Sequence, residues 1–395
     1  MIIKIEKATG ERVIYWLAYF IFMIICTMII PLQNRNDFIV YICVFTIGLT
    51  LVIVSDLIYN KKLSFFLLFI SLLIIGCFMA FRDQTAIDDW QYQRKFLALA
   101  GKSFSQAFIE GENEKGFVIL DYFLYKITNG NYDIAQAITV YFSFFIWAVA
   151  IFKNKKKCNL PFMVFFLITH YYCLIMGAGL IRMFIAIPIV FLSLNSLWEK
   201  NAKKFLFIIL IASFFHVSAL VLLLLIPFSL KKYNFSAHWK AYLMILCVII
   251  PFLFQIISKF AIQLFGQRYE GYSVIGTLYV SIGDFDILPI WGICLYYYIK
   301  SEKEENERFK IYLVLLSLTM IFSIVSSMVS LGRVVYYTNL GILLFASELM
   351  QKKGKQSLDI LLCLVLMAYG VFYMMYSGFM NVSVVTNMFP IKLFL

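Results

Sequence analysis

Two arginines interrupt apolar runs of this sequence, and their chemistry is the first clue to what the chain does. Arg182 lies in GAGLIRMFIAIPIV, and Arg333 lies in SMVSLGRVVYYTNLGILLF. Neither arginine has an acidic residue within ten positions along the chain. An arginine near the centre of a bilayer costs about 2.5–3.5 kcal/mol on insertion scales. We therefore expect each one to face a wet cavity, a partner group or an anionic ligand.

A third arginine, Arg82, ends the third apolar run. At a helix end the side chain could simply extend to the membrane surface, and Arg182 and Arg333 could pair with buried backbone groups. Gathered at one cavity, however, the three arginines would suit a pyrophosphate, because each guanidinium donates planar pairs of hydrogen bonds. We predict that Arg82, Arg182 and Arg333 bind such a group.

Three further residues could move or hold a proton. Asp88 lies in AIDDWQYQRKF, Glu114 in GENEKGF, and His216 in the apolar run FFHVSAL. The carboxylates could belong to a solvated acidic loop, and the histidine could be a packing residue. The functional interpretation is a group that orients or deprotonates a sugar hydroxyl as it attacks an anomeric carbon.

The composition excludes a soluble domain. Hydrophobic residues make up 63% of the 395 residues and charged residues only 14%, with a mean hydropathy of +0.87. The net charge of +12 comes largely from short loops between apolar segments, which indicates membrane orientation rather than nucleic-acid binding. The spacings C-x-x-C and H-E-x-x-H are absent, so we expect no metal and no cofactor.

A helix needs about 20 apolar residues to cross a bilayer. The pattern predicts an all-α polytopic integral membrane protein, one domain over 1–395 with about 11–12 membrane helices. A long insert at 82–133 holds FVILDYFLYKI, which is too short to span and is typical of an interfacial or re-entrant helix. The expected spans are 13–31, 38–59, 63–81, 134–152, 161–178, 180–198, 205–230, 241–265, 287–299, 311–331, 334–350 and 358–376.

Lysine and arginine predict the orientation, because they favour cytoplasmic loops. The basic loops 153–157, 199–204, 231–240, 300–310 and 351–356 should all be cytoplasmic. Since the loops on both sides of 205–230 are basic, we expect that segment to fold back as a re-entrant hairpin with His216 at its turn. The N-terminus is then cytoplasmic, while the insert, Arg333 and the C-terminus are extracytoplasmic. The alternative is a single long tilted helix.

Five segments resemble the EpsG-type branch of the Wzy-like polysaccharide polymerases. Their order and spacing cover most of the chain, and FHVSAL fits the family pattern fully. Ala86 and Ile87 replace the usual Gly-Thr pair, and Met183 replaces the usual Gln. The five segments are FRDQTAIDDWQYQRKF (81–96), ENEKGFVILDYFL (112–124), LIRMFIAIPIVFLS (180–193), FFHVSAL (214–220) and LGRVVYY (331–337).

The resemblance implies a glycosyltransferase of a bacterial cytoplasmic (inner) membrane. Such a polymerase joins oligosaccharide repeat units carried on undecaprenyl pyrophosphate, at the outer face, into capsule, O-antigen or exopolysaccharide. Its expected partners are these lipid-linked oligosaccharides, membrane lipids and a chain-length regulator protein. Metal-independent transfer would invert the anomeric carbon. The alternatives are a flippase for lipid-linked glycans, or a related O-antigen ligase.

Overall fold

The computed structural model describes a helical chain. The described residues are 10–30, 32–81, 88–170, 179–230, 238–240, 242–246, 249, 286–301, 303–326, 333–352 and 357–375. Within these ranges the regular elements are all helices, and no β-strand occurs. The all-α prediction is confirmed for the part of the chain that is described.

Six helices in the described ranges are long and apolar enough to cross a membrane. Shorter apolar helices accompany them at Ile14–Ile29, Leu160–Thr169 and Val217–Ser229. The chain is therefore a polytopic membrane protein, as its composition predicts. The six spans are Phe38–Leu57, Lys61–Ala80, Tyr132–Lys153, Ile181–Trp198, Glu305–Ser326 and Ser357–Met375.

The chain divides into two compact units. The first comprises Met1–Pro188 and Ala346–Leu395, and the second comprises Ile189–Phe345. The division falls inside two helices, α10 (Ile181–Trp198) and α16 (Leu340–Gln351). Arg182 and Glu114 belong to the first unit, whereas Arg333 and His216 belong to the second.

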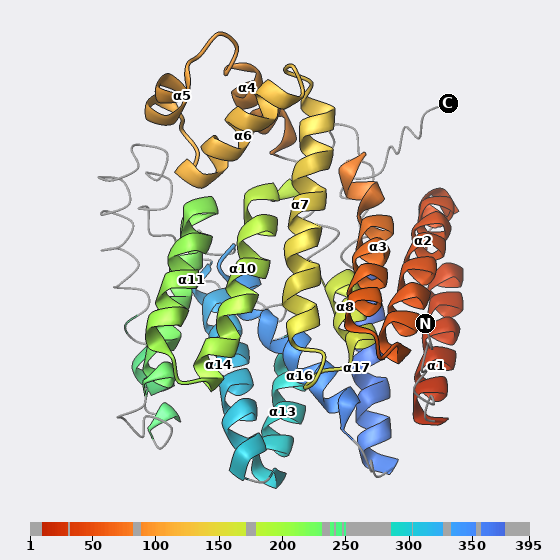
Figure 1. Ribbon diagram of the computed structural model, residues 1–395. Helices are drawn as coiled ribbons and strands as arrows, with labels where there is room; N and C mark the ends of the chain where they lie inside the picture. Colours follow the sequence, from red (N-terminus) through yellow and green to blue (C-terminus); the bar gives the residue numbers. More distant parts are fainter. Residues whose placement is uncertain are drawn as a thin grey trace. The chain divides into compact units, whose positions relative to one another are not determined.

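Small residues bring the helices of the first unit close together. The side chain of Ser71 in α3 (Lys61–Ala80) donates a hydrogen bond to the backbone oxygen of Gly48, at 2.8 Å. A Cβ atom on Gly76 would lie 2.5 Å from the ring of Phe144 in α7 (Tyr132–Lys153). Close backbone approach at small residues is the usual way in which membrane helices associate. Helices α1 (Gly10–Ile29), α2 (Leu32–Leu57), α8 (Leu160–Thr169) and α17 (Ser357–Met375) complete this unit (Figure 1).

The insert contains three short helices that gather at one end of α7 (Figure 1). They are α4 (Asp89–Leu97), α5 (Phe104–Glu110) and α6 (Lys115–Ile127). Helix α6 contains the short apolar segment FVILDYFLYKI, which the sequence predicts to be helical. A tight turn joins α6 to α7, with positive φ angles at Asn129 (51°) and Gly130 (79°). The turn fixes the direction in which α7 leaves the insert.

The segment expected to fold back does so within the second unit. Helix α11 (Ala202–Phe215) ends at His216, whose backbone is extended, and the 3₁₀ helix η2 (Val217–Ser229) packs against α11. The Nζ atom of Lys200, before α11, donates a hydrogen bond to the backbone oxygen of Phe228, 3.0 Å away, near the end of η2. The two ends of the segment therefore meet, and a hairpin rather than one long helix is confirmed.

Two of the expected spans differ from the observed helices. The segment 334–350 comprises α15 (Val335–Thr338) and α16, separated at Asn339. Helix α14 (Lys303–Ser326) begins within the basic segment 300–310, because charged residues at a helix end stay helical once the apolar part is packed. Helix α13 (Leu288–Lys300) packs against α14. Of the expected span 241–265, residues 242–246 are helical and most of the remainder lies outside the described ranges.

The hairpin makes a prediction about sidedness. Single cysteines replacing Lys203 and Lys232, in a background without native cysteines, should react with a membrane-impermeant thiol reagent from the same side of the membrane. The reason is that the chain returns at His216 to the end where it started. Reaction of the two positions from opposite sides would show that the segment crosses the membrane.

Candidate functional site

Lysines hold the insert together around its acidic residues. Lys95 Nζ lies 2.9 Å from a Glu112 carboxylate oxygen. Lys115 Nζ donates to the backbone oxygens of Phe108 (2.5 Å) and Gly111 (3.2 Å), and so satisfies carbonyls at the end of α5. Ser103 starts the same helix with a capping box that includes Gln106. These contacts fix the short stretch that leads from α5 to Glu114 at the start of α6.

Arg182 forms a buried ion pair with Glu114. One Nη1 hydrogen bond joins the guanidinium to a Glu114 carboxylate oxygen, and the Nε atom donates to the Tyr92 hydroxyl at 3.2 Å. The guanidinium carbon also lies 5.5 Å from the centroid of the Tyr92 ring. Arg182 is only 4% exposed and Glu114 only 7%. The charge that the sequence left without a local partner therefore has one 68 positions earlier in the chain.

This ion pair has two structural consequences. Arg182 of α10 contacts Glu114, the N-cap residue of α6, and Tyr92 of α4, so the pair ties two insert helices to the start of a membrane helix. Removing one member of a buried pair leaves an uncompensated charge, at a cost of about 3–5 kcal/mol. Tyr92 and Glu114 use two of the five N–H donors of Arg182. Among the described residues, the guanidinium makes no further hydrogen bond.

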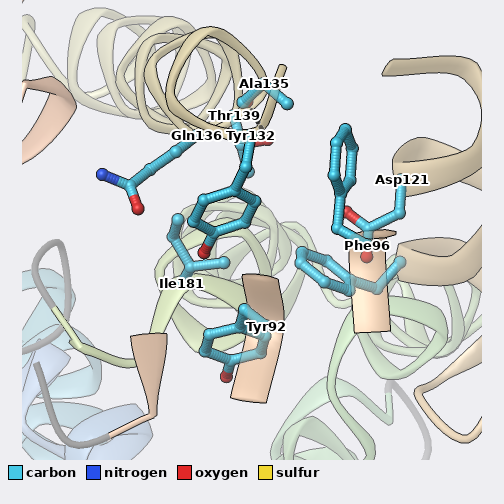
Figure 2. Close-up of a pocket in the computed structure, with 9 residues that line it drawn as sticks. Tyr92, Phe96, Asp121, Tyr132, Ala135, Gln136, Thr139 and Ile181 are labelled. Carbon is cyan, nitrogen blue, oxygen red and sulfur yellow. Dashed lines mark hydrogen bonds between the residues drawn. The ribbon is translucent and has the colours of Figure 1, made fainter. Parts of the chain in front are cut away.

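Next to the ion pair lies a small pocket with aromatic walls. Each insert helix that lines it contributes a pair at i and i+4, which places both side chains on one face: Tyr92 and Phe96 from α4, and Phe117 and Asp121 from α6. The start of α7 and Ile181 supply the remaining walls. In Figure 2, Asp121 and Phe96 stand on one side of the pocket and face the side chains of Tyr132, Gln136 and Ile181 on the other.

Asp121 is a site residue to which the sequence analysis gave no role. Burial raises the pKa of its carboxyl well above its usual range, and the positive charge of Arg182 partly opposes that rise. Among the residues that the structure describes, Asp121 makes no hydrogen bond or ion pair. The available sequence signal was its position as the one charged residue in FVILDYFLY.

In the second unit, two of the family-like segments meet at His216. The Nδ1 atom of His216 lies 3.3 Å from the Tyr337 hydroxyl oxygen, and both side chains are buried. Tyr337 belongs to α15, which packs against η2. Arg333, half-buried, lies in the turn that precedes α15. FFHVSAL and LGRVVYY are thus brought together by the hairpin.

The six predicted site residues fall into separate groups. Arg182 and Glu114 are joined in the first unit, while His216 and Arg333 lie near the same helix of the second. Asp88 precedes α4 and is half-buried, and its backbone oxygen accepts hydrogen bonds from the Gln91 and Tyr92 amides. Arg82 lies outside the described residues. No group of three or more potential metal ligands gathers within the described ranges.

The sequence model of the EpsG family matches residues 65–392. The chain belongs to the EpsG family. At the level of that family, this makes it a polysaccharide-polymerase-like membrane protein and a glycosyltransferase-like polymerase. No curated protein matches the chain, and no solved structure does. The match includes Tyr92, Glu114, Arg182, His216 and Tyr337, so both residue groups lie within the region that defines this EpsG-family chain.

The ion pair makes a prediction about stability. Glu114→Gln should lower the midpoint of thermal unfolding in detergent, because it leaves the buried Arg182 charge without its counter-charge, at a cost of about 3–5 kcal/mol. The double variant Glu114→Leu with Arg182→Met should recover most of that loss, since it removes both charges together. As a matched control, Glu110→Gln, which alters an exposed carboxylate paired with the half-buried Lys102, should change the midpoint little. Equal midpoints for Glu114→Gln and wild type would show that the pair is not structural.

Proposed function

We propose that this EpsG-family protein is a polysaccharide polymerase that joins repeat units carried on undecaprenyl pyrophosphate. The reaction would take place at the outer face of a bacterial cytoplasmic membrane, with the N-terminus cytoplasmic, and the insert and the C-terminus extracytoplasmic. Its product would be a capsule, O-antigen or exopolysaccharide. A chain-length regulator protein is a proposed partner, alongside the lipid-linked oligosaccharides and membrane lipids.

One observation carries the proposal: Tyr92, Glu114 and Arg182, from three family-like segments, meet at one buried ion pair beside a pocket. A lipid-linked substrate has a pyrophosphate at the membrane surface and sugars just outside it. The Arg182 guanidinium lies at the start of a membrane helix, where it could meet the pyrophosphate. The aromatic side chains of the insert lie beside it, where they could meet the sugars. Rings of this kind can stack on sugars, and the guanidinium can donate to phosphate oxygens.

The proposed reaction is a single displacement. The acceptor hydroxyl oxygen attacks the anomeric carbon of the donor, its proton passes to a base, and the bond to the pyrophosphate breaks with both electrons leaving on oxygen. Configuration at the anomeric carbon inverts. Because the pyrophosphate is already a good leaving group, the reaction as proposed requires no metal.

Arg182 would donate its remaining N–H groups to the pyrophosphate and stabilise the charge as it leaves. We assign Glu114 the role of orienting Arg182, in place of the base role that its sequence position suggested, because its carboxylate is occupied by the guanidinium. Arg333, Arg82 and His216 remain proposed contributors to phosphate binding and proton handling, and Asp88 remains a candidate to orient the acceptor.

The test compares Arg182 and Arg333, which are proposed to bind the pyrophosphate, with Arg94, which is not. Arg182→Lys keeps the charge opposite Glu114 but removes the planar donors, so polymer formation should fall about 10²-fold while the protein level stays normal. Arg333→Ala should act in the same way. In cells lacking the native gene, both variants should accumulate single repeat units on lipid and lack long polymer, as read from gel ladders. Arg94→Ala, an exposed arginine of α4, is the matched control and should make normal polymer.

Purified protein separates an enzyme from a flippase. Lipid-linked repeats mixed with the wild-type protein in detergent should yield chains of several repeats. Transport of the same lipid across vesicle membranes, without any elongation, would instead support the flippase. Normal chain lengths in both the Arg182→Lys and Arg333→Ala strains would contradict the proposed roles of these arginines.

A further inference from the structure

Asp121 is the one charged side chain that lines the pocket beside the ion pair. The polar side chains around it are Tyr92, Tyr132, Gln136 and Thr139, and the remaining walls are aromatic or aliphatic. The Tyr92 hydroxyl is engaged by Arg182, and the Thr139 hydroxyl donates to the backbone oxygen of Ala135 at 2.8 Å. Figure 2 shows the Asp121 carboxyl beside Phe96, across the pocket from Tyr132 and Gln136. Asp121 therefore places a carboxylate among aromatic, aliphatic and uncharged polar side chains.

The fold itself gains nothing from this carboxylate. Asp121 forms no hydrogen bond or ion pair with the described residues, and its withdrawal from water disfavours the ionised form. A half-buried carboxyl group without a direct partner lowers stability. Groups that cost stability in this way are found where activity requires them. Glu114 differs from Asp121, because the Glu114 carboxylate forms an ion pair with Arg182.

The size of the pocket identifies what could bind next to Asp121. Its solvent-accessible volume is about 10 Å³, roughly the space for one water molecule. A whole sugar ring cannot enter such a space, but one hydroxyl group of a sugar occupies about the same volume as a water molecule. The aromatic walls would exclude further water from that hydroxyl and could contact the ring that carries it.

We propose that Asp121 is the general base of the polymerase and that this pocket receives the acceptor hydroxyl of the incoming repeat unit. The inference rests on the function proposed above. The acceptor O–H bond breaks as its oxygen bonds to the anomeric carbon, and the proton moves to the Asp121 carboxylate. The donor carbon–oxygen bond breaks at the same time, and the pyrophosphate leaves as an anion. Asp121 then releases the proton to water before the next addition.

The neighbours of Asp121 fit this role. A general base works best when its pKa lies near the working pH, and burial moves the Asp121 carboxyl in that direction. The titratable groups that face it from the packed elements are Tyr92 of α4, Tyr132 of α7 and Arg182 of α10. Arg182, the group proposed to hold the pyrophosphate, is the cation whose charge opposes the rise in the Asp121 pKa and so favours the ionised form.

The test measures polymer formation by the purified full-length protein. The probe is the polyprenyl-pyrophosphate-linked repeat extracted from cells in which the gene is deleted. Asp121→Asn should reduce the rate about 10²–10⁴-fold, because it keeps the shape of the side chain and removes the base. Asp121→Glu should restore part of the rate. Asp133→Asn, an exposed carboxylate in the first turn of α7, is the matched control and should stay within twofold of wild type.

Two further readouts separate a base from a structural residue. The wild-type rate should rise with pH through the raised pKa of Asp121, and this rise should be absent in Asp121→Asn. The unfolding midpoint of Asp121→Asn should equal or exceed that of wild type at neutral pH. The sign follows from linkage: a raised folded-state pKa stabilises the fold fully below the unfolded value of about 3.9, and this stability is lost as pH rises through the folded-state pKa.

Each outcome is decisive. If wild type elongates and Asp121→Asn elongates equally well, Asp121 is not the base and the polymerase function stands. An Asp121→Asn variant that melts far below wild type, with a wild-type pH profile in Asp121→Glu, would show a structural role. If the wild-type protein forms no polymer from the lipid-linked repeats, the proposed function falls and this inference falls with it.

Discussion

The buried ion pair between Arg182 and Glu114 is the interaction on which the first unit depends. A membrane helix that starts with a buried arginine is unfavourable by itself, and the sequence offers no nearby acid to relieve it. The fold brings Glu114 from the insert instead, and Tyr92 adds a hydrogen bond and a ring contact. One charge thereby positions three helices. It also explains why the insert must be ordered, since its lysines fix the stretch that ends at Glu114.

The pocket follows from the same arrangement. Once α4 and α6 are tied to α10, their i and i+4 pairs and the start of α7 enclose a space for about one water molecule. Asp121 remains in this space at a cost to stability, with Arg182 as its only nearby described cation. The two acidic residues of α6 and its cap therefore have different environments. Glu114 is neutralised by direct contact, whereas Asp121 is exposed to the pocket. Differences of this kind commonly separate a positioning group from a reacting one.

In the second unit, the placement of basic residues along the sequence predicts the hairpin. Basic residues on both sides of 205–230 predict that the chain folds back within this segment, and the hydrogen bond from Lys200 to the Phe228 carbonyl shows that the two ends of the segment meet. The turn falls at His216, which then meets Tyr337 from α15. The hairpin that the charge pattern predicts thus also brings FFHVSAL and LGRVVYY together. Their proximity could not be inferred from the 121 positions that separate them.

The sequence by itself determined the helical class, the polytopic membrane character, the hairpin and the EpsG family. These depend on properties that are local along the chain: apolar length, the placement of lysine and arginine, and the order of short motifs. It also indicated that Arg182 needed a partner, because burying a charge is costly wherever it occurs. Only the tertiary structure decided that the partner is Glu114, that Asp88 lies at the start of α4, and that Asp121 faces the pocket. Ion pairing and burial depend on which distant helices meet, and no periodicity within one helix records that meeting.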